Sequence, residues 1–325
     1  MENLKLSVIM PAYNEGEQIK KILDKIVSLN NGKFELIVVD DGSTDCSPAI
    51  LDEYACDNKF IKVVHQKNQG CLFARRKGIS LANGYYITFI DADDMIEDQY
   101  FDDFEGTIKN DADFFLLNNK LILEGDKKSF IEKDFLKTGN IDKKIVEKWI
   151  IGNKVGAVWD KIFKTEILKS VLDEEAIAIN FGDDILLNLQ YLERCSKVYC
   201  ENSSSYIHYM DSFTSVCKAI SFKRLHEIDD LYFFIFNNIE FIDGKVSEHI
   251  YDATVVFNLV NTIYQLLKVN RLCDLDKELS TLKALKILKD RFRPDCTKDK
   301  IYFDALINRR YKVIKLIFTL RGALR

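Results

Sequence analysis

One stretch decides the fold of this chain: Tyr85-Tyr86-Ile87-Thr88-Phe89-Ile90-Asp91-Ala92-Asp93-Asp94. Its β-branched and aromatic residues predict a buried strand, and three carboxylates follow at the C-terminal end of that strand. Like charges this close raise one another's pKa and destabilise a fold unless a cation or hydrogen-bond donors lie among them. The stretch therefore predicts a binding partner for the acids. The alternative is a helix N-cap within a solvated acidic turn.

Strands and helices alternate on the N-terminal side of this stretch. Apolar strand patterns cover residues 4–10, 34–39 and 60–65, and helical spacing of apolar residues follows each of them. This alternation predicts an α/β fold with a doubly wound, mainly parallel sheet, in which ligands bind beyond the C-terminal strand ends. The polar clusters all follow predicted strands: Tyr13-Asn14-Glu15, Asp40-Asp41, Lys67-Asn68-Gln69-Gly70 and Asp91-Ala92-Asp93-Asp94.

The alternation loosens beyond about residue 110, and from Ser221 onward the pattern is helical almost throughout. Between these points we expect one or two strands at 114–123, helices at 141–151, 163–171 and 183–192, and short strands at 197–200 and 205–209. The sequence therefore predicts an α/β domain at 1–215 and a helical C-terminal extension at 216–325.

Composition excludes several classes of protein. The 325 residues are 47% hydrophobic, enough for a large buried core, and the net charge of −5 argues against a nucleic-acid partner. The eight cysteines lack the spacing of a zinc site. The first residues show no leader pattern and no apolar run reaches transmembrane length, so we expect a cytoplasmic protein.

The C-terminal end differs in charge from the rest of the chain. Six basic residues and no acid lie between Arg309 and Arg325, so the remainder carries about −11. The apolar residues of this end make a helical stripe: Val313, Leu316, Ile317, Leu320 and Leu324. Such a basic amphipathic helix predicts peripheral contact with an anionic membrane, here the inner face of the plasma membrane. The alternative is that the helix packs on its own domain or on an acidic partner subunit. The sequence does not decide whether the protein forms a homo-oligomer.

The neighbouring strand ends indicate what the acids bind. Asp40 and Asp41 offer carboxylates to the donors of a nucleobase or to ribose hydroxyls, on a turn that Gly42 allows to bend sharply. The chain lacks the glycine-rich loops with which dinucleotide-binding and ATPase folds hold phosphates. The diphosphate of a nucleotide would need a divalent cation at the acid cluster, helped by Arg75 or Arg76. A solvated helix face is the alternative for the two arginines.

Four motifs, in this order, closely resemble the family 2 glycosyltransferases of GT-A fold. They are Ser7–Glu15, Val38–Asp45, Asn68-Gln69-Gly70 with Ala74-Arg75, and Phe89–Asp94. The resemblance implies inverting transfer of a sugar from a nucleoside-diphosphate sugar, usually a UDP-sugar, with Mn²⁺ or Mg²⁺ as cofactor. It implies a nucleotide-binding half at about 1–110 and an acceptor half at about 111–215. Saccharide acceptors are common in the family, and with the basic tail they predict a lipid-linked precursor of a surface polysaccharide.

The resemblance also implies roles for single residues. Asp93 and His208 would bind the metal, Tyr13 would stack on the base and Asp41 would meet the uracil, although a lone histidine is more often structural. Arg76 stands where the family more often has asparagine, which favours Arg75 as the nucleotide contact. Asp94 is left as a helix cap. The predicted nucleotide-sugar site is Pro11, Ala12, Tyr13, Glu15, Asp40, Asp41, Asn68, Arg75, Asp91 and Ala92.

An inverting transfer needs a general base for the acceptor hydroxyl. Phe181-Gly182-Asp183-Asp184 resembles the family's Gly-Glu-Asp motif, whose second acid is the base, so Asp184 is the predicted base. Asp183 replaces the usual glutamate, and which of the two acids faces the acceptor stays open. Two acids that stabilise a helix N-terminus are the alternative. Val158–Phe163 resembles the family's Trp-x-Lys segment, which implies acceptor contacts by Trp159 and Lys161; a core tryptophan is the alternative.

Two functions from other classes compete with this one. A sugar nucleotidyltransferase would need a basic, glycine-rich loop after the first strand, where the chain has Pro11-Ala12-Tyr13-Asn14-Glu15. A catalytically silent scaffold would have lost the base or the metal acids, and both are present. The sequence therefore favours a glycosyltransferase whose donor sugar and acceptor linkage it leaves open.

Overall fold

The computed structural model describes residues 5–123, 129–131, 135–173, 181–210, 221–268 and 274–323. Its internal contacts divide the chain into two compact units. The sheet unit comprises residues 1–143 and 157–215, and the helical unit comprises residues 144–156 and 216–325. The segment 144–156, which the sequence places in the first domain, thus belongs to the helical unit.

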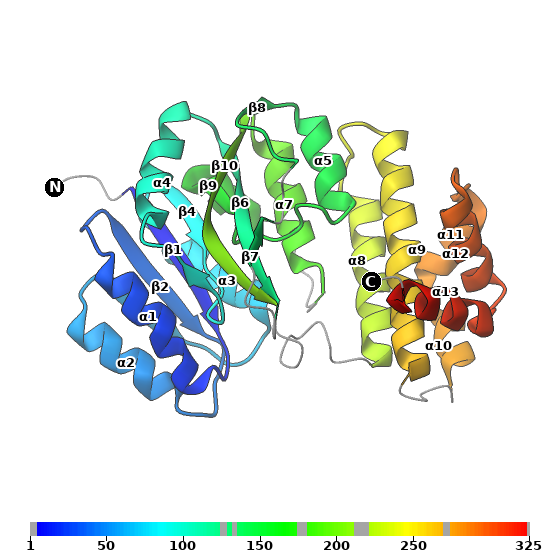
Figure 1. The fold of residues 1–325 in the computed structure, drawn as a ribbon, viewed down its shortest axis with the longest axis horizontal. Coiled ribbons are helices and arrows are strands. Elements are labelled where there is room, and N and C mark those ends of the chain that lie inside the picture. Colours follow the sequence, from blue (N-terminus) through cyan, green and yellow to red (C-terminus); the bar gives the residue numbers. More distant parts are fainter. Residues whose placement is uncertain are drawn as a thin grey trace. The chain divides into compact units, whose positions relative to one another are not determined.

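The sheet unit is built on one mixed sheet (Figure 1). Its strands are β1 (Leu6–Ala12), β2 (Phe34–Asp40), β3 (Ile61–His65), β4 (Tyr86–Phe89), β5 (Met95–Ile96), β6 (Phe114–Leu123), β7 (Ser129–Ile131), β8 (Gly139–Ile141), β9 (Lys161–Lys164) and β10 (Val198–Met210). They lie in the order β3-β2-β1-β4-β9-β6-β10-β5, with β7 beside β6 and β8 beside β10. The pairs β1–β2, β2–β3, β1–β4 and β6–β10 are parallel, whereas β9 is antiparallel to both of its neighbours. The predicted class, an α/β fold with a mixed, mainly parallel sheet, is confirmed.

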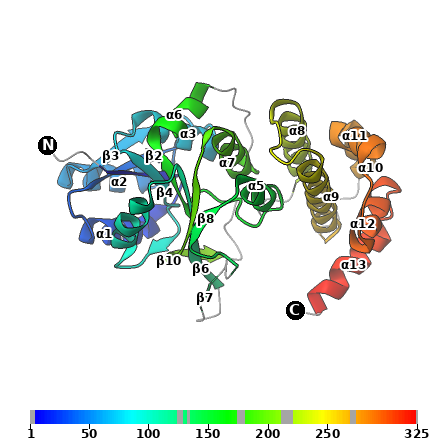
Figure 2. The same ribbon diagram turned by 90° about the horizontal axis from the view of Figure 1, so that it is seen from above.

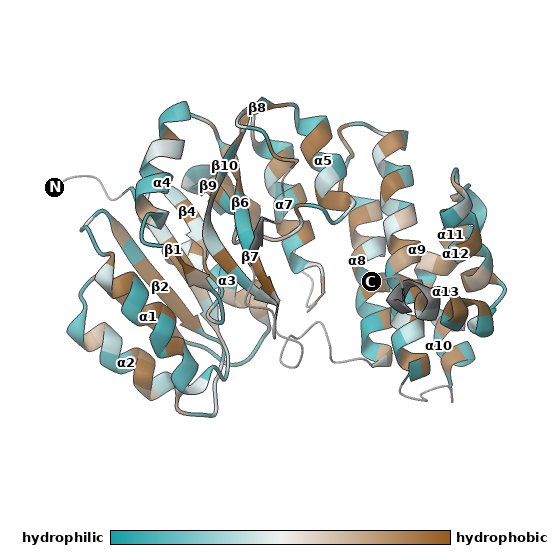
Figure 3. Cartoon of the chain, viewed as in Figure 1, coloured by the Kyte–Doolittle hydropathy of each residue, from teal (hydrophilic) through white to brown (hydrophobic). Residues whose placement is uncertain are grey.

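Helices connect these strands: α1 (Ile19–Ser28), α2 (Ser47–Asp57), α3 (Cys71–Leu81), α4 (Tyr100–Thr107), α6 (Thr165–Ser170) and α7 (Asp183–Arg194). In α1, Ile19, Ile22, Leu23 and Ile26 recur at helical spacing and all four are buried, so one stripe of the helix packs inward. β2 is hydrophobic along most of its length, while α1 and α2 alternate hydrophobic and hydrophilic residues (Figure 3). This difference is expected when helices cover both faces of a parallel sheet.

Two predicted segments differ from the structure. Residues 163–171, expected as one helix, divide into the end of β9 and helix α6, because Phe163 packs its ring against Phe89, Phe114 and Tyr191 in the sheet core. The two short strands expected at 197–200 and 205–209 are one strand, β10. Its register against β6 shifts between Glu201 and Tyr206, and this irregularity explains why the alternation of the sequence is interrupted there.

The helical unit contains most of α5 (Lys143–Ile151) and the helices α8 (Phe222–Asn238), α9 (Lys245–Lys268), α10 (Leu275–Thr281), α11 (Lys283–Arg291), α12 (Thr297–Ile307) and α13 (Tyr311–Ala323). α9 packs against α8, α12 and α13 (Figure 2). Buried Asp252 on α9 accepts hydrogen bonds from Tyr232 at 2.7 Å and from Arg291 at 2.7 and 3.0 Å. Glu147 of α5 accepts backbone hydrogen bonds from Ile242 and Asp243 just before α9, which ties α5 into this unit.

The last helix packs on its own unit through one side. Ile314 is fully buried, and the ring of Phe318 lies against Phe257, Tyr264 and Tyr302. On the other side, Lys312, Lys315 and Leu316 are exposed, Leu316 to 59%. The side chains of Leu320 and Leu324, the last two residues of the predicted stripe, lie outside the described part. Among the residues that the structure describes, none of the helices has the length and hydropathy needed to cross a membrane.

Candidate active site

The loops that follow β1 and β2 are joined by hydrogen bonds. The backbone N–H of Asn14 donates to Ser43 at 2.9 Å, and Asn14 Oδ1 accepts from the backbone N–H of Thr44 at 2.8 Å. Asn14 has a φ of 56°, a left-handed conformation that asparagine tolerates better than most residues. Tyr13 lies in the first of these loops and is 47% exposed, so its ring is accessible to a ligand.

Asp41 holds a third loop in place. Its buried carboxylate accepts hydrogen bonds from Gln66 Nε2 at 2.7 Å and from the backbone N–H groups of Gln69 and Gly70 at 2.9 and 2.8 Å. Gly42 beside it has a φ of 79°, and a Cβ there would lie 2.7 Å from the backbone nitrogen of Asn68. Asp41 therefore shapes the edge of the candidate nucleotide pocket, and its contact with a base stays a prediction.

Asp40 is likewise buried and engaged within the protein. It accepts hydrogen bonds from the backbone N–H of Ser43 at 3.0 Å and from His65 Nδ1 at 2.7 Å. His65 Nε2 lies 3.1 Å from Asp52, and hydrogen bonding to the two carboxylates raises the pKa of His65. Of the predicted nucleotide contacts at these strand ends, Tyr13 and Asn68 are the ones with exposed side chains.

The acid cluster after β4 is attached to β10 through Asp94. This buried carboxylate accepts hydrogen bonds from the hydroxyl of Tyr206 at 2.7 Å, from His208 Nδ1 at 3.0 Å and from the backbone N–H of Tyr209 at 2.9 Å. The prediction of Asp94 as a helix cap is therefore wrong. The next helix, α4, begins only at Tyr100, and β5 lies between.

The exposed acid of the cluster is Asp93, and its charge is unfavourable in the absence of a cation. Desolvation, together with repulsion from Asp94 and Asp91, raises the pKa of Asp93 to about 6. Glu15, which follows β1, is affected by the same charge. Burial and repulsion from Asp93 raise the pKa of Glu15 to about 7. Carboxylates from the ends of β1 and β4 thus repel one another, as expected where a cation or a ligand's donors bind.

Arg75 on α3 contacts three carboxylates from two distant segments of the chain. Its guanidinium donates to Asp91 at 3.1 Å, to Asp183 at 2.7 Å and to Asp184. Arg75 is 5% exposed, and its Nε has no hydrogen-bond partner among the described residues. Arg76 donates to the backbone carbonyls of Val171 and Leu172. The structure thus assigns the two arginines different contacts.

The predicted base lies in the first turn of α7. Gly182, with a φ of 79°, turns the chain into the helix, and Asp183 and Asp184 follow. Desolvation raises the pKa of Asp184, with repulsion from Asp183 and Asp91 in the same direction, while Arg75 opposes the shift. A quarter of the Asp184 side chain is exposed, against 12% for Asp183. Asp184 is therefore the more accessible of the two acids.

The predicted acceptor contacts Trp159 and Lys161 do not have the expected exposure. Lys161 is fully buried and donates to Asp160 at 2.6 Å and to the carbonyl of Ala157. Trp159 is 6% exposed and stacks on Tyr206 and His208, with ring centroids 4.7 and 4.9 Å away. In this structure both side chains pack within the protein, as the alternative interpretation of the tryptophan expects.

The fit of a divalent metal rests on Asp93 and His208. Among the described residues, no three side chains of the histidine, cysteine or acidic types are grouped closely enough to hold a metal on their own. A hard cation such as Mg²⁺ or Mn²⁺ commonly takes one or two protein ligands and completes its shell with phosphate oxygens and water. The two side chains fit such a site, and they do not fit an all-protein cage.

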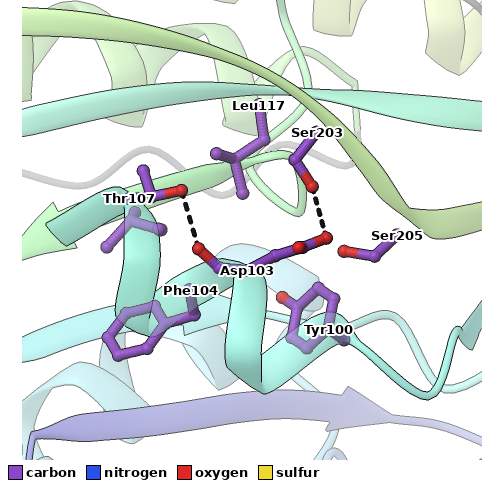
Figure 4. Close-up of a pocket in the computed structure, with 8 residues that line it drawn as sticks. Tyr100, Asp103, Phe104, Thr107, Leu117, Ser203 and Ser205 are labelled. Atoms are coloured by element: carbon purple, nitrogen blue, oxygen red, sulfur yellow. Dashed lines mark hydrogen bonds between the residues drawn. The ribbon is translucent and has the colours of Figure 1, made fainter.

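Figure 4 shows a small pocket that neither Asp93 nor His208 lines. It is bordered by Tyr100, Asp103, Phe104, Thr107, Leu117, Ile162, Ser203 and Ser205, none of them a predicted site residue. Ser203 donates to the carboxylate of Asp103, and Thr107 donates to its carbonyl at 2.8 Å. The pocket therefore belongs to the packing of α4 beneath the irregular part of β10.

Sequence reasoning missed Tyr206 and misread Asp94. The available signal was the spacing of Tyr206 and His208, which puts both side chains on one face of a strand. The parallel pairing of β10 with β6 and the antiparallel pairing with β5 then bring this face to the acid cluster.

Comparison with known proteins decides the family. The model of Glycosyl transferase family 2 matches residues 7–170, which contain the loops after β1, β2, β3 and β4. The chain belongs to glycosyl transferase family 2. This is the family that the resemblance of its motifs predicts.

Three proteins illustrate how this member of the family relates to others. EpsH of Bacillus subtilis is 33% identical over 173 residues, 52% of this chain and 50% of EpsH, so the match spans half the length of that relative. S. aureus TarS residues 1–349, crystallised with UDP-GlcNAc, has a TM-score of 0.64 at 18% identity, covering 95% of this chain and 92% of that one. The mannosyltransferase PcManGT of Pyrobaculum calidifontis, with GDP-Man and Mn²⁺, has a TM-score of 0.54 at 15% identity, covering 97% and 87%. Both structures share the GT-A type of fold with this chain.

Proposed function

We propose that this glycosyltransferase moves a sugar from a UDP-sugar to a hydroxyl of a saccharide, with inversion at the anomeric carbon. The observation that carries the proposal is the triple contact of Arg75 with Asp91, Asp183 and Asp184. It keeps the predicted donor-binding loop and the predicted base at hydrogen-bond distance from one side chain. A transfer reaction needs donor and base in such proximity.

The donor would bind along the ends of β1, β2 and β4. Exposed Tyr13 offers a ring for stacking on the base, and the loop organised by Asp41 borders the same edge. TarS, which shares this fold, was crystallised with UDP-GlcNAc, and this supports a uridine nucleotide as donor. The remaining predicted contacts are Pro11, Ala12, Glu15, Asp40, Asn68, Asp91 and Ala92.

Asp184 would act as the general base. The acceptor oxygen forms a bond to the anomeric carbon, the bond from that carbon to the diphosphate oxygen breaks, and the diphosphate leaves with the electron pair. The hydroxyl proton passes to the carboxylate of Asp184. A raised pKa strengthens a carboxylate as a proton acceptor as long as it is ionised at the working pH. Asp183 would share the contact with Arg75 and hold it beside the base.

Asp93 and His208 would hold a divalent cation. When bound, the cation would offset the charge that develops on the leaving diphosphate. Two observations support this assignment: the elevated pKa of Asp93 among its acidic neighbours, and the presence of Mn²⁺ in the complex of PcManGT. Comparison of activity with Mn²⁺, Mg²⁺ and EDTA would identify the cation.

The acceptor would be a lipid-linked saccharide, reached at an anionic membrane surface. The helical unit contains 23 basic and 15 acidic residues, whereas the rest of the chain is strongly acidic. On α13, Lys312 and Lys315 stand beside the exposed Leu316, a combination suited to anionic lipid headgroups. Packing of α13 on its own unit through Ile314 and Phe318 leaves this side of the helix uncovered within the unit.

The membrane proposal can be tested by flotation with liposomes that contain anionic lipid. A triple variant, Lys312→Glu, Lys315→Glu and Leu316→Ser, should lose flotation. Its control, Lys286→Glu with Lys289→Glu, changes two exposed charges on α11 and should retain most of it. Equal flotation of the wild type and the triple variant would overturn the proposal.

The reaction itself can be tested by incubating the full chain with a panel of UDP-sugars, with Mn²⁺, Mg²⁺ or EDTA. We expect release of UDP with one donor and a rise in melting temperature with that donor plus metal. A nucleotidyltransferase would instead release pyrophosphate from UTP and a sugar phosphate. Absence of UDP release and of any thermal shift across the panel would refute the proposed activity.

A further inference from the structure

We infer that Asp94, Tyr206 and Trp159 form a positioning group that sets the distance and orientation of the two metal-binding side chains, Asp93 and His208. The inference rests on the proposed function, because it assumes that these two side chains bind a divalent cation. It gives Trp159 a role other than acceptor binding, and it gives Asp94 a role other than helix capping.

Asp94 connects two distant parts of the chain. Asp93 follows β4, and His208 lies near the end of β10, more than a hundred residues later. Asp94, the neighbour of Asp93, bonds both His208 Nδ1 at 3.0 Å and the backbone N–H of Tyr209 at 2.9 Å. β5 adds backbone pairing between Met95 and Ile207. The loop Asp91–Asp94 is therefore fixed to β10 by side-chain and backbone hydrogen bonds.

The hydrogen bond to Asp94 also fixes the tautomer of the His208 ring. An ionised Asp94 can only accept hydrogen bonds, so Nδ1 of His208 must carry the proton. The neutral imidazole then has its lone pair on Nε2, the atom with which it would bind a metal. Carboxylates fix the tautomer and the orientation of metal-binding histidines in this way, and their loss commonly costs about 10- to 100-fold in metal affinity.

Tyr206 and Trp159 pack around that hydrogen bond. The hydroxyl of Tyr206 donates to Asp94 at 2.7 Å and accepts from the backbone N–H of Asp91 at 3.2 Å, so it bridges both ends of the acid loop. The indole of Trp159 stacks on Tyr206 at an interplanar angle of 9° and on His208 at 24°. Rotation of the Tyr206 ring or of the His208 ring would therefore displace the Trp159 indole that stacks on both.

The test measures Mn²⁺ affinity directly. Free Mn²⁺ would be followed by its electron paramagnetic resonance signal during titration of the full chain with UDP present. Tyr206→Phe removes one hydroxyl, and we expect it to raise the Kd for Mn²⁺ by about 10-fold, with a larger rise, up to about 100-fold, for Asp94→Asn. UDP affinity in the absence of metal should stay within about twofold of wild type.

A matched control separates positioning from general loss of stability. Tyr191 is also fully buried, and its hydroxyl also bridges two groups, the backbone N–H of Lys164 at 2.9 Å and the carbonyl of Asp113. Tyr191→Phe should lower the melting temperature without changing the Kd for Mn²⁺. Wild-type Mn²⁺ affinity in both Tyr206→Phe and Asp94→Asn would overturn the inference while leaving the proposed function intact. Absence of Mn²⁺ binding by the wild type would overturn both.

Discussion

Arg75 donates a hydrogen bond from Nη1 to the carboxylate of Asp184, 109 residues further along the chain. The same nitrogen donates to Asp183, and the other terminal nitrogen donates to Asp91. The guanidinium therefore lowers the pKa of the predicted base, against the upward shift caused by desolvation. The balance between the two effects sets the pH at which Asp184 can accept a proton.

Arg75→Lys should move the acid limb of the kcat–pH profile. A single ammonium cannot contact three carboxylates as a planar guanidinium does, so the pKa of Asp184 should rise. We expect the acid limb to shift upward by about 1 pH unit, measured under saturating donor. Arg76→Lys, which alters contacts to two backbone carbonyls, should leave the limb in place. Equal shifts in both variants would contradict the assigned role of Arg75.

Asp184→Asn and Asp183→Asn distinguish the two acids. Loss of the base should reduce kcat by roughly 10²- to 10⁴-fold, because an amide cannot accept the hydroxyl proton. We expect this loss for Asp184→Asn and a smaller one for Asp183→Asn, with both variants folded by circular dichroism. A larger loss in Asp183→Asn would exchange the two roles.

Stability should fall as the pH rises from about 4 to 7. The pKa values of Glu15 and Asp93 rise from ordinary values of 4.5 and 3.8 to about 7 and about 6. In this window the folded chain keeps protons that the unfolded chain has released, so the free energy of unfolding decreases with pH. Urea titrations between pH 4 and 8, without metal or nucleotide, would measure the free energy of unfolding at each pH. An increase in this free energy between pH 4 and 7 would contradict the prediction.

Asp93→Asn should be more stable than the wild type at pH 8, yet unable to respond to metal. Removing the charge should raise the free energy of unfolding by about 1 kcal/mol, since solvent screens much of the repulsion at this exposed side chain. With Mn²⁺ and UDP the wild type should gain melting temperature and the variant should not, because the ligand must be an ionised carboxylate. Near-normal turnover of Asp93→Asn would refute its role at the metal.

Lys161→Met should affect folding rather than acceptor binding. It leaves buried Asp160 without the ammonium that lies 2.6 Å away, and we expect a loss of about 3 to 5 kcal/mol in the free energy of unfolding. Lys164→Met, on the same strand but partly exposed, should cost less than about 1 kcal/mol. Wild-type stability with a raised KM for acceptor would return Lys161 to the acceptor site.

The N-terminal half of the fold was predictable because its information is local. Apolar strands, helical spacing and polar loops recur within each strand–helix unit and predict β1, β2, β3 and β4. The order in which these strands lie, β3-β2-β1-β4, depends on packing between the units and was not predicted. β9 was missed because four residues are too short for a period, and its burial depends on aromatic partners from β4, β6 and α7.

The site was predictable by residue type and less so by contact. The sequence identifies Asp91, Asp93, Asp183 and Asp184 as candidates, but it contains no signal that one arginine joins three of them. From the sequence, Asp41 is equally able to bind a nucleobase or to hold a loop. The hydrogen bonds from the backbone N–H groups of Gln69 and Gly70 show that it holds a loop. Lys161 could not be recognised as buried, since a lysine is normally exposed unless a partner compensates its charge.

The membership of residues 144–156 in the helical unit affects how this protein can be divided or recombined. Val146, Ile150 and Ile151 of α5 are fully buried, and Glu147 binds backbone groups just before α9. A protein cut after residue 215 would keep the buried carboxylate of Glu147 without these backbone partners, a mismatch that lowers stability. Exchange of the C-terminal helices between relatives by a single crossover near residue 215 would create the same mismatch. Such an exchange would have to carry two separate segments of the gene, and this constrains α5 to change together with α8 and α9.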